Sequence, residues 1–271
     1  MAFTIAHVAA ALPFYRCQKY ISFEALVIGT MLPDLPYFLG SDRAVWQQSH
    51  QWLGVLTYCL PWGILVFTLW HWVFKGAALV LIQPWYAVQL KPKDTINSAL
   101  WHRLKAYSDF WLKVALGLLV GASTHLLWDG TTHPDGFIAQ QVGWLQFKLD
   151  IIGWVDVSVA RFLQYVSSIL GLLAVLYFVI TRLKCQPSAP DLKYKISFFS
   201  KFQILLFAVL WFVFSSFLAL HAAFKWHDLL LVSYYSFLAR VLVGFLQGAG
   251  IFFIVYALLY CITSHFKAIR R

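Results

Sequence analysis

Five apolar runs in this chain of 271 residues are long enough to cross a lipid bilayer. A spanning helix needs about 20 mostly apolar residues. Charged residues make up only 12% of the chain, whereas soluble domains carry roughly a quarter, so too few polar side chains are present to cover a water-facing surface. We therefore predict an all-α polytopic membrane protein with about five transmembrane helices. The runs cover residues 53–74, 111–131, 160–182, 202–224 and 236–262.

A further apolar stretch, from Phe23 to Leu39, is shorter and is interrupted by Pro33, Asp34 and Pro36. Proline cannot donate a backbone hydrogen bond, and its ring clashes with the preceding helical turn. The sequence therefore predicts a short broken or re-entrant helix here rather than a span. Between the first two spans, basic residues beside aromatic residues in the segment 75–110 are typical of helices that lie in the membrane interface.

The chain has no internal repeat, and we interpret residues 1–271 as one integral membrane domain. Residues 1–180 contain the polar cluster discussed below, and residues 181–271 add two further transmembrane helices. The net charge of +10 comes from Lys and Arg spread over short loops rather than along one basic stripe. That distribution favours membrane lipids with anionic headgroups as partners and disfavours nucleic acid. The sequence leaves the oligomeric state open.

Basic residues in the short loops predict the orientation, because cytoplasmic loops of membrane proteins are enriched in Lys and Arg. They number five, four and three in the segments 75–110, 183–201 and 263–271. They number three, one and one in the opposite set, 1–52, 132–159 and 225–233. Twelve against five favours the first set as cytoplasmic. Residues 1–52, with Cys17, are then expected on the outer, periplasmic side, and Cys185 on the inner side.

Seven ionisable residues lie at or near membrane depth, where such side chains are costly and tend to mark function. His125 and Asp129 stand four residues apart at the end of the second span, which places both on one helix face. If the first span runs inward and the second returns outward, the candidates from separate parts of the sequence meet at the outer membrane face. Several His with two Asp on one face favour a divalent metal site. The candidates are His7, Asp34, His50, His125, Asp129, His133 and Asp135.

Two simpler interpretations of these residues stay open. His125 and Asp129 could form a hydrogen-bonded pair that only locks one turn of their helix. Asp34 could cap the N-terminus of a helix, a role that Asp favours. Neither role would require a metal ion.

Several short motifs follow one another between residues 3 and 172. They are FTIAHVAAALP, SFEALVIGTMLPDLPYFL, SHQWLG, LLVGASTHLLWDGTTHPDG and LQYVSSILG. In these motifs the chain resembles an uncharacterised bacterial membrane-protein family described as domain of unknown function 4184. More distantly, it is similar to inner-membrane metal-dependent hydrolases that are regulated with the bacterial DNA-damage response. The resemblance implies a metal-ligand set of His7, Asp34, His50, His125 and Asp129.

Two classes of function remain. The first is a membrane-embedded metal-dependent hydrolase that acts on a lipid or lipid-linked ester, either a phosphoester or an acyl ester, at the outer face of the bacterial inner membrane. Zinc is the favoured ion for His and Asp ligands, with manganese and iron as alternatives. His133 and Asp135, just beyond the helix, are the candidates for a general base. The second class is a non-enzymatic scaffold or partner-binding protein whose cluster is structural. A transporter is disfavoured, because few ionisable residues lie in mid-span and paired broken helices are lacking.

Overall fold

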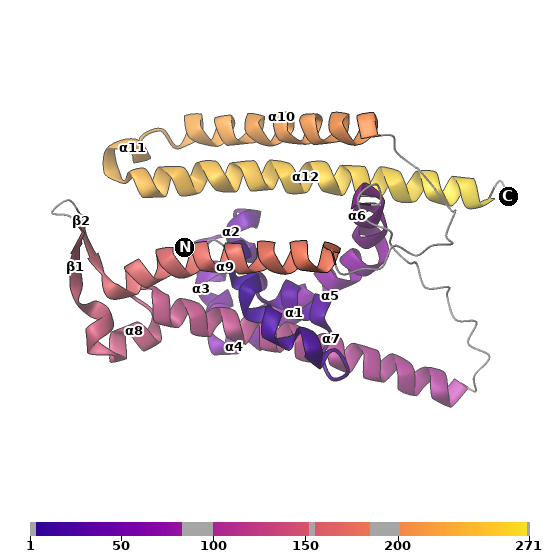
Figure 1. The fold of residues 1–271 in the computed structure, drawn as a ribbon, viewed down its shortest axis with the longest axis horizontal. Helices are drawn as coiled ribbons and strands as arrows, with labels where there is room; N and C mark the ends of the chain where they lie inside the picture. Colours follow the sequence, from indigo (N-terminus) through magenta and orange to yellow (C-terminus); the bar gives the residue numbers. More distant parts are fainter. Residues whose placement is uncertain (1–3, 83–99, 152–154, 185–200, 270–271) are drawn as a thin grey trace. The chain divides into compact units, whose positions relative to one another are not determined.

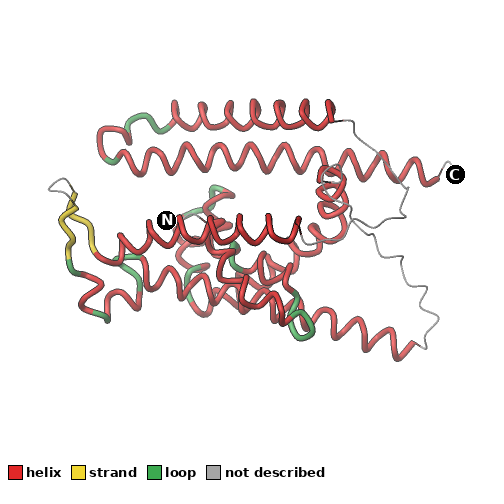
Figure 2. The backbone as a smooth tube through the Cα atoms, in the orientation of Figure 1, coloured by secondary structure: helices red, strands yellow, loops and turns green. Residues whose placement is uncertain are grey.

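The computed structural model describes residues 4–82, 100–151, 155–184 and 201–269, and these residues are almost entirely helical (Figures 1 and 2). They fall into two compact units. Unit 1 comprises residues 1–68 and 92–186, and unit 2 comprises residues 69–91 and 187–271. All the candidate functional residues belong to unit 1.

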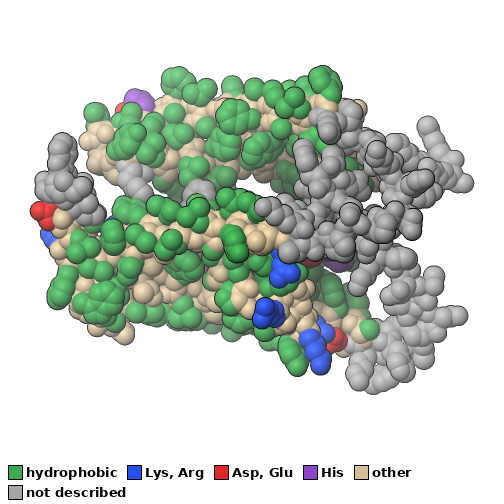
Figure 3. All heavy atoms as spheres, in the orientation of Figure 1, with side chains coloured by type: hydrophobic (Ala, Val, Ile, Leu, Met, Phe, Trp, Pro, Cys, Tyr) green, Lys and Arg blue, Asp and Glu red, His purple; other side chains and the backbone are tan. Residues whose placement is uncertain are grey.

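Among the described residues, five helices are long and apolar enough to cross a membrane, which confirms the predicted fold class. Large hydrophobic side chains remain exposed along these helices, as Figure 3 shows for one face of the molecule. Such a surface is suited to lipid rather than to water. The spans are Trp52–Leu81, Ala106–Thr132, Val159–Arg182, Phe202–Lys225 and Ser236–Ser264.

Unit 1 is built around the long helix α7 (Leu100–Thr132) and helix α9 (Val159–Lys184), which runs back in the opposite direction (Figure 1). Its N-terminal part is a series of short elements: η1 (Thr4–Cys17), α1 (Phe23–Gly29), η2 (Leu32–Asp34), α2 (Leu35–Leu39), α3 (Arg43–Ser49), α4 (Trp52–Gly54), η3 (Val55–Cys59) and α5 (Leu60–Leu69). The link between α7 and α9 contains α8 (Phe137–Gln141), η5 (Gly143–Gln146) and the strands β1 (Lys148–Ile151) and β2 (Val155–Ser158). The antiparallel pair β1–β2 has no counterpart in the sequence prediction.

The predicted break between Phe23 and Leu39 is confirmed. Ser22 begins α1 by accepting a hydrogen bond from the backbone N–H of Ala25, at 3.3 Å. The helix ends at Gly29, a 3₁₀ turn follows around Pro33, and α2 resumes for five residues. Gly40, in the left-handed conformation with φ of 70°, ends α2.

Helices α1 and α7 approach each other backbone to backbone, because glycines occupy the contact. A Cβ at Gly29 would lie 2.5 Å from the carbonyl oxygen of Leu118, and a Cβ at Gly117 would lie 2.6 Å from that of Ser22. A Cβ at Gly121 would clash with the carbonyl oxygen of Leu26. Gly117, Gly121, His125 and Asp129 are spaced by four residues, so the α7 face that packs on α1 continues into the polar cluster.

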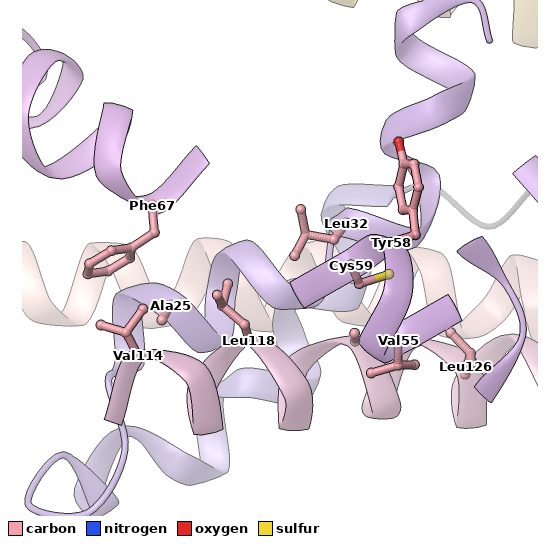
Figure 4. Close-up of a cluster of buried hydrophobic side chains, with 10 residues drawn as sticks. Ala25, Leu32, Val55, Tyr58, Cys59, Phe67, Val114, Leu118 and Leu126 are labelled. Atoms are coloured by element: carbon pink, nitrogen blue, oxygen red, sulfur yellow. The ribbon is translucent and has the colours of Figure 1, made fainter. Parts of the chain in front are cut away.

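A hydrophobic core adjoins this contact (Figure 4). Val114, Leu118 and Leu126 of α7 pack with side chains from α1, η2, η3 and α5. The other members of the core are Ala25, Leu32, Val55, Tyr58, Cys59, Phe67 and Ala122. Pro61 cannot donate to the carbonyl of Thr57, which accords with the π-helical turn that η3 forms just before α5.

Unit 2 contains η4 (Trp70–Phe74), α6 (Lys75–Ile82), α10 (Lys201–Lys225), α11 (Leu229–Val232) and α12 (Tyr234–Ile269). Helices α10 and α12 lie side by side (Figure 1), with Gly244 and Gly248 against α10. The predicted interfacial segment 75–110 lies partly outside the described residues. Its first part is α6, and its last part, from Leu100, forms the first turns of α7 rather than a separate helix.

The N-terminal helix η1 runs alongside the second half of α7, away from the polar cluster. Its first turns reach the polar cluster, whereas Tyr15 near its end packs on Phe178, with ring centroids 5.1 Å apart. Just beyond it, the Ser22 N–H donates to the carbonyl oxygen of Lys113, 3.0 Å away. Lys113 and Asp129 are separated by about 24 Å of α-helix. The 14 residues of η1, at about 2 Å per residue in a 3₁₀ helix, cover a comparable depth.

This course separates Cys17 from His7 along the axis of α7, whereas the sequence analysis treats residues 1–52 as one loop. Cys17, Arg16 and Lys19 are exposed where η1 ends, in the turn that precedes the contact of Ser22 with Lys113. If Arg16 and Lys19 are counted with the segments 75–110, 183–201 and 263–271, the count of basic residues changes from twelve against five to fourteen against three. Cys185 lies outside the described residues.

We expect Cys17 and the cluster end of unit 1 to be labelled from opposite sides of the membrane. In a background of Cys59→Ala, Cys185→Ser and Cys261→Ser, a membrane-impermeant maleimide should modify Cys17 only from the cytoplasmic side. With Cys17→Ser added, a cysteine introduced by Asp135→Cys, at an exposed position beyond α7, should react only from the outer side. Labelling of both cysteines from the same side would contradict the course of η1.

Candidate metal centre

Four elements of unit 1 bring His and Asp side chains together. Helix η1 carries His7, η2 carries Asp34, His50 follows α3, and α7 carries His125 and Asp129. The structure thus gathers all five residues of the implied ligand set. His125 is 0% exposed, His7 1% and Asp34 2%, so the core of the cluster is buried.

The two carboxylates stand between the imidazole rings. Asp129 places Oδ1 at 3.3 Å from Nε2 of His7 and Oδ2 at 3.4 Å from Nε2 of His125. Asp34 places Oδ1 at 3.4 Å from Nε2 of His50 and at 3.9 Å from Nε2 of His125. The rings of His7 and His125 are stacked, with centroids 4.0 Å apart. His125 is therefore common to both carboxylates.

Backbone carbonyls orient two of the imidazoles. Nδ1 of His125 lies 2.8 Å from the carbonyl oxygen of Thr30, and Nδ1 of His50 lies 3.0 Å from that of Trp46. A carbonyl only accepts, so each Nδ1 carries a proton. In the neutral ring, Nε2 then presents its lone pair to the carboxylates. A lone pair facing an anionic oxygen is repulsive unless a second proton or a metal ion lies between them.

Several polar atoms at this point have no hydrogen-bond partner within the described part of the chain. These atoms include Nε2 of His7, Nε2 of His125 and Oδ1 of Asp129. Their mutual distances are short, but the contacts are not aligned as hydrogen bonds. Buried polar groups are nearly always paired, and an ion is one explanation for such exceptions. The donor set of imidazole nitrogens and carboxylate oxygens suits zinc and similar divalent ions.

The cluster contains two overlapping groups that could hold a metal ion. One is His7, Asp34 and His125, and the other is His50, His125 and Asp129; in each, one ligand atom from every residue lies within 4.8 Å of the others. The first group is buried, whereas the second includes partly exposed side chains: 20% for His50 and 16% for Asp129. The cluster therefore combines a buried group of side chains with a group that is partly exposed.

The simpler interpretations fit less well. Asp34 precedes α2 but its side chain makes no capping hydrogen bond. The Thr4 hydroxyl donates to Oδ2 of Asp34 at 2.6 Å, which leaves Oδ1 directed at the imidazoles. Burial favours the neutral form of Asp34, but His125 and His50 outweigh it, so the pKa of Asp34 lies below its usual value. His125 and Asp129 each contact other elements, so they do more than lock a turn of α7.

The two candidates for a general base are placed differently. His133 approaches Asp129, with Nδ1 3.4 Å from Oδ1 and 3.2 Å from the carbonyl oxygen of that residue. Its Nε2 lies 2.9 Å from Nε2 of Gln164. Burial lowers the pKa of His133. Asp135 is exposed, and the described residues give its side chain no hydrogen bond or ion pair to the cluster.

Three contributors to the centre were not predicted as ligands or bases. Thr4 hydrogen bonds to Asp34, the Thr30 carbonyl orients His125, and Gln164 contacts His133. Gln164 had one detectable signal, since an amide in the apolar run of α9 is costly without a partner. Thr4 lies three residues before His7, a spacing that places both side chains on one face of the 3₁₀ helix η1.

Comparison with known proteins identifies the family. A family profile described as a domain of unknown function (DUF4184) matches residues 1–258. The match extends well beyond residue 172, where the motifs recognised in the sequence end, and reaches into α12. No match was found among curated proteins or among solved structures. The chain, a multi-pass helical protein with a buried His/Asp cluster, therefore belongs to the DUF4184 family.

Proposed function

We propose that this protein is a membrane-embedded metal-dependent hydrolase, and that His7, Asp34, His50, His125 and Asp129 hold one or two divalent ions, zinc in the first place. The observation that carries the proposal is the convergence of imidazole nitrogens and carboxylate oxygens from four elements, several of which have no hydrogen-bond partner among the described residues. A bound divalent ion would supply Lewis-acid polarisation of an ester oxygen and activation of water.

The protein's own residues provide the rest of such a site. The carbonyl oxygens of Thr30 and Trp46 fix the rings of His125 and His50, as outer partners of metal-bound histidines commonly do. His133 has both nitrogens engaged, so it is better suited to holding Asp129 than to accepting a proton. Asp135, exposed and two residues farther along, is the better candidate for the general base.

A lipid or lipid-linked ester fits the surroundings of the cluster. Trp52 and Phe137, from elements that adjoin the cluster end of α7, are exposed and have ring centroids 6.0 Å apart. Exposed aromatic side chains near the end of a span are typical of the membrane interface. The basic residues at the opposite end of unit 1 favour the outer, periplasmic face of a bacterial inner membrane for the cluster.

The alternative is a non-enzymatic scaffold with a structural cluster. The burial of His7, Asp34 and His125 favours that alternative, because structural metal sites are closed. The partial exposure of His50 and Asp129 favours the enzyme, which needs an accessible side. An assay of hydrolysis distinguishes the enzyme from the scaffold, whereas metal binding is compatible with both.

We expect the purified, zinc-loaded protein in lipid nanodiscs to hydrolyse at least one member of a panel of phosphoester and acyl-ester lipids. Asp129→Asn should lower the rate at least about 100-fold, because it removes a proposed ligand. The matched substitution Asp228→Asn, at an exposed position in unit 2, should leave the rate unchanged. Stoichiometric metal with no hydrolysis of any lipid would instead support the structural alternative.

A further inference from the structure

Behind Asp129 lies a chain of hydrogen bonds that reaches from α9 into the cluster. Gln164 is fully buried on α9, although its side chain is polar. Arg161, one turn earlier, donates from a guanidinium nitrogen to Oε1 of Gln164 at 2.9 Å. On the other side of the amide, Nε2 of Gln164 lies 2.9 Å from Nε2 of His133. The chain thus runs from Arg161 through Gln164 and His133 to the backbone carbonyl of Asp129.

The chemistry of these groups fixes the direction of each hydrogen bond. A guanidinium has only donors, so the group of Gln164 that faces Arg161 must be the carbonyl oxygen. The NH₂ group of Gln164 must then face His133, and it can only donate. Nε2 of His133 is therefore the acceptor and carries no proton. In the neutral imidazole the proton resides on Nδ1.

Within the part of the chain that the structure describes, the contacts of Nδ1 of His133 are with acceptors. Its neighbours are Oδ1 of Asp129 at 3.4 Å and the carbonyl oxygen of Asp129 at 3.2 Å. A protonated Nδ1 satisfies both contacts, whereas an unprotonated Nδ1 would place a lone pair against two oxygens. The contacts of the two ring nitrogens therefore require the same tautomer, with a proton on Nδ1 and none on Nε2. The chain therefore selects one tautomer and one ring orientation of His133.

We infer that Arg161 and Gln164 are positioning residues of the cluster: they hold His133 as the Nδ1-protonated imidazole, whose Nδ1 lies against both the backbone carbonyl and the carboxylate of Asp129. This inference deepens the proposed function and rests on it where it concerns metal affinity. The tautomer of His133 is a separate observable that does not require a metal ion. Outer partners of this kind typically change metal affinity by 10- to 100-fold when they are removed.

Imidazole nitrogen NMR tests the tautomer directly. The full-length protein, labelled with ¹⁵N in the His rings, is measured in detergent micelles after chelator treatment, and His133→Gln identifies the His133 signals. We expect a pyrrole-type resonance for Nδ1 and a pyridine-type resonance for Nε2 in the wild type. In Gln164→Glu the carboxylate can only accept, so Nε2 should acquire a proton. Gln140→Glu, at an exposed position of α8, is the matched control and should leave His133 unchanged.

Zinc affinity tests the link to Asp129. Gln164→Leu removes the donor to His133 without adding a charge, and it should weaken zinc binding by about tenfold or more, whereas Gln140→Leu should not. An Nε2-protonated His133 in the wild type, or no change in Gln164→Glu, would overturn the inference. An unchanged zinc affinity in Gln164→Leu would refute the positioning of Asp129. If the wild type binds no zinc, the proposed function fails, and the His133 tautomer still tests the chain of hydrogen bonds.

Discussion

Zinc at about a thousand times its dissociation constant is expected to raise the free energy of unfolding by about 4 kcal/mol relative to the chelator-treated protein. The physical reason is that the proposed ligands come from η1, η2, the end of α3 and α7, which an unfolded chain cannot hold together. Without the ion, two carboxylates and the imidazole lone pairs face one another in a buried space. The measurement is denaturant or thermal unfolding in detergent across a zinc titration.

Asp34→Asn and Asp228→Asn form the matched pair for this titration. Asp34 lies in the cluster, so its variant should lose the zinc-dependent increment. Asp228 is exposed in unit 2, in contact with His227, so its variant should keep the full increment. An equal increment in both variants would mean that zinc acts elsewhere, and no increment in the wild type would contradict a metal site in the cluster.

Gly121→Leu is expected to destabilise the protein by about 3 kcal/mol or more, at the upper end of overpacking effects. A Cβ at this position would clash with the carbonyl oxygen of Leu26 on α1, and backbone cannot move aside as a side chain can. Separation of α1 from α7 would also draw the carbonyl of Thr30 away from His125. The variant should therefore lose zinc affinity together with stability.

Gly250→Leu provides the control for that substitution. Gly250 lies within α12, and nothing among the described residues stands within 4 Å of a Cβ placed there. Thermal unfolding in the same detergent should therefore change little, and zinc binding should be retained. Equal loss of stability in both variants would show that the close approach of α1 and α7 is not what Gly121 provides.

The sequence predicts the spans well because a lipid environment permits few alternatives. Long apolar runs must form helices in the bilayer, since every backbone polar group has to be paired internally. Ionisable residues are also easy to identify in such apolar runs, because they are rare there. His125 and Asp129 stand out in α7 for this reason, and the structure brings them together with His7, Asp34 and His50.

The course of η1 escapes prediction for a geometric reason. An α-helix of its 14 residues would cover only about 21 Å. The longer rise of a 3₁₀ helix extends its reach, and runs of this length are uncommon, so no sequence rule anticipates one. A prediction that treats residues 1–52 as one loop therefore places Cys17 at the same end as His7.

The contacts behind the cluster escape prediction because they join residues far apart in sequence. Gln164 and His133 are separated by 31 positions, and His125 and Thr30 by 95. The pairing depends on the packing of α7 on α1 and of α9 near η1, which glycines such as Gly121 and Gly171 permit. Apolar content identifies the helices, but it does not specify which faces meet.

The central claim, that the buried His/Asp cluster binds a metal ion, is tested most directly by elemental analysis of the purified protein in detergent. The wild type is measured beside a His125→Ala, Asp129→Ala double variant that has been checked for folding by circular dichroism. We expect one or two equivalents of zinc, or of manganese or iron, in the wild type and a loss of that metal in the variant. A folded wild type without metal, or an equal metal content in both proteins, would contradict the claim.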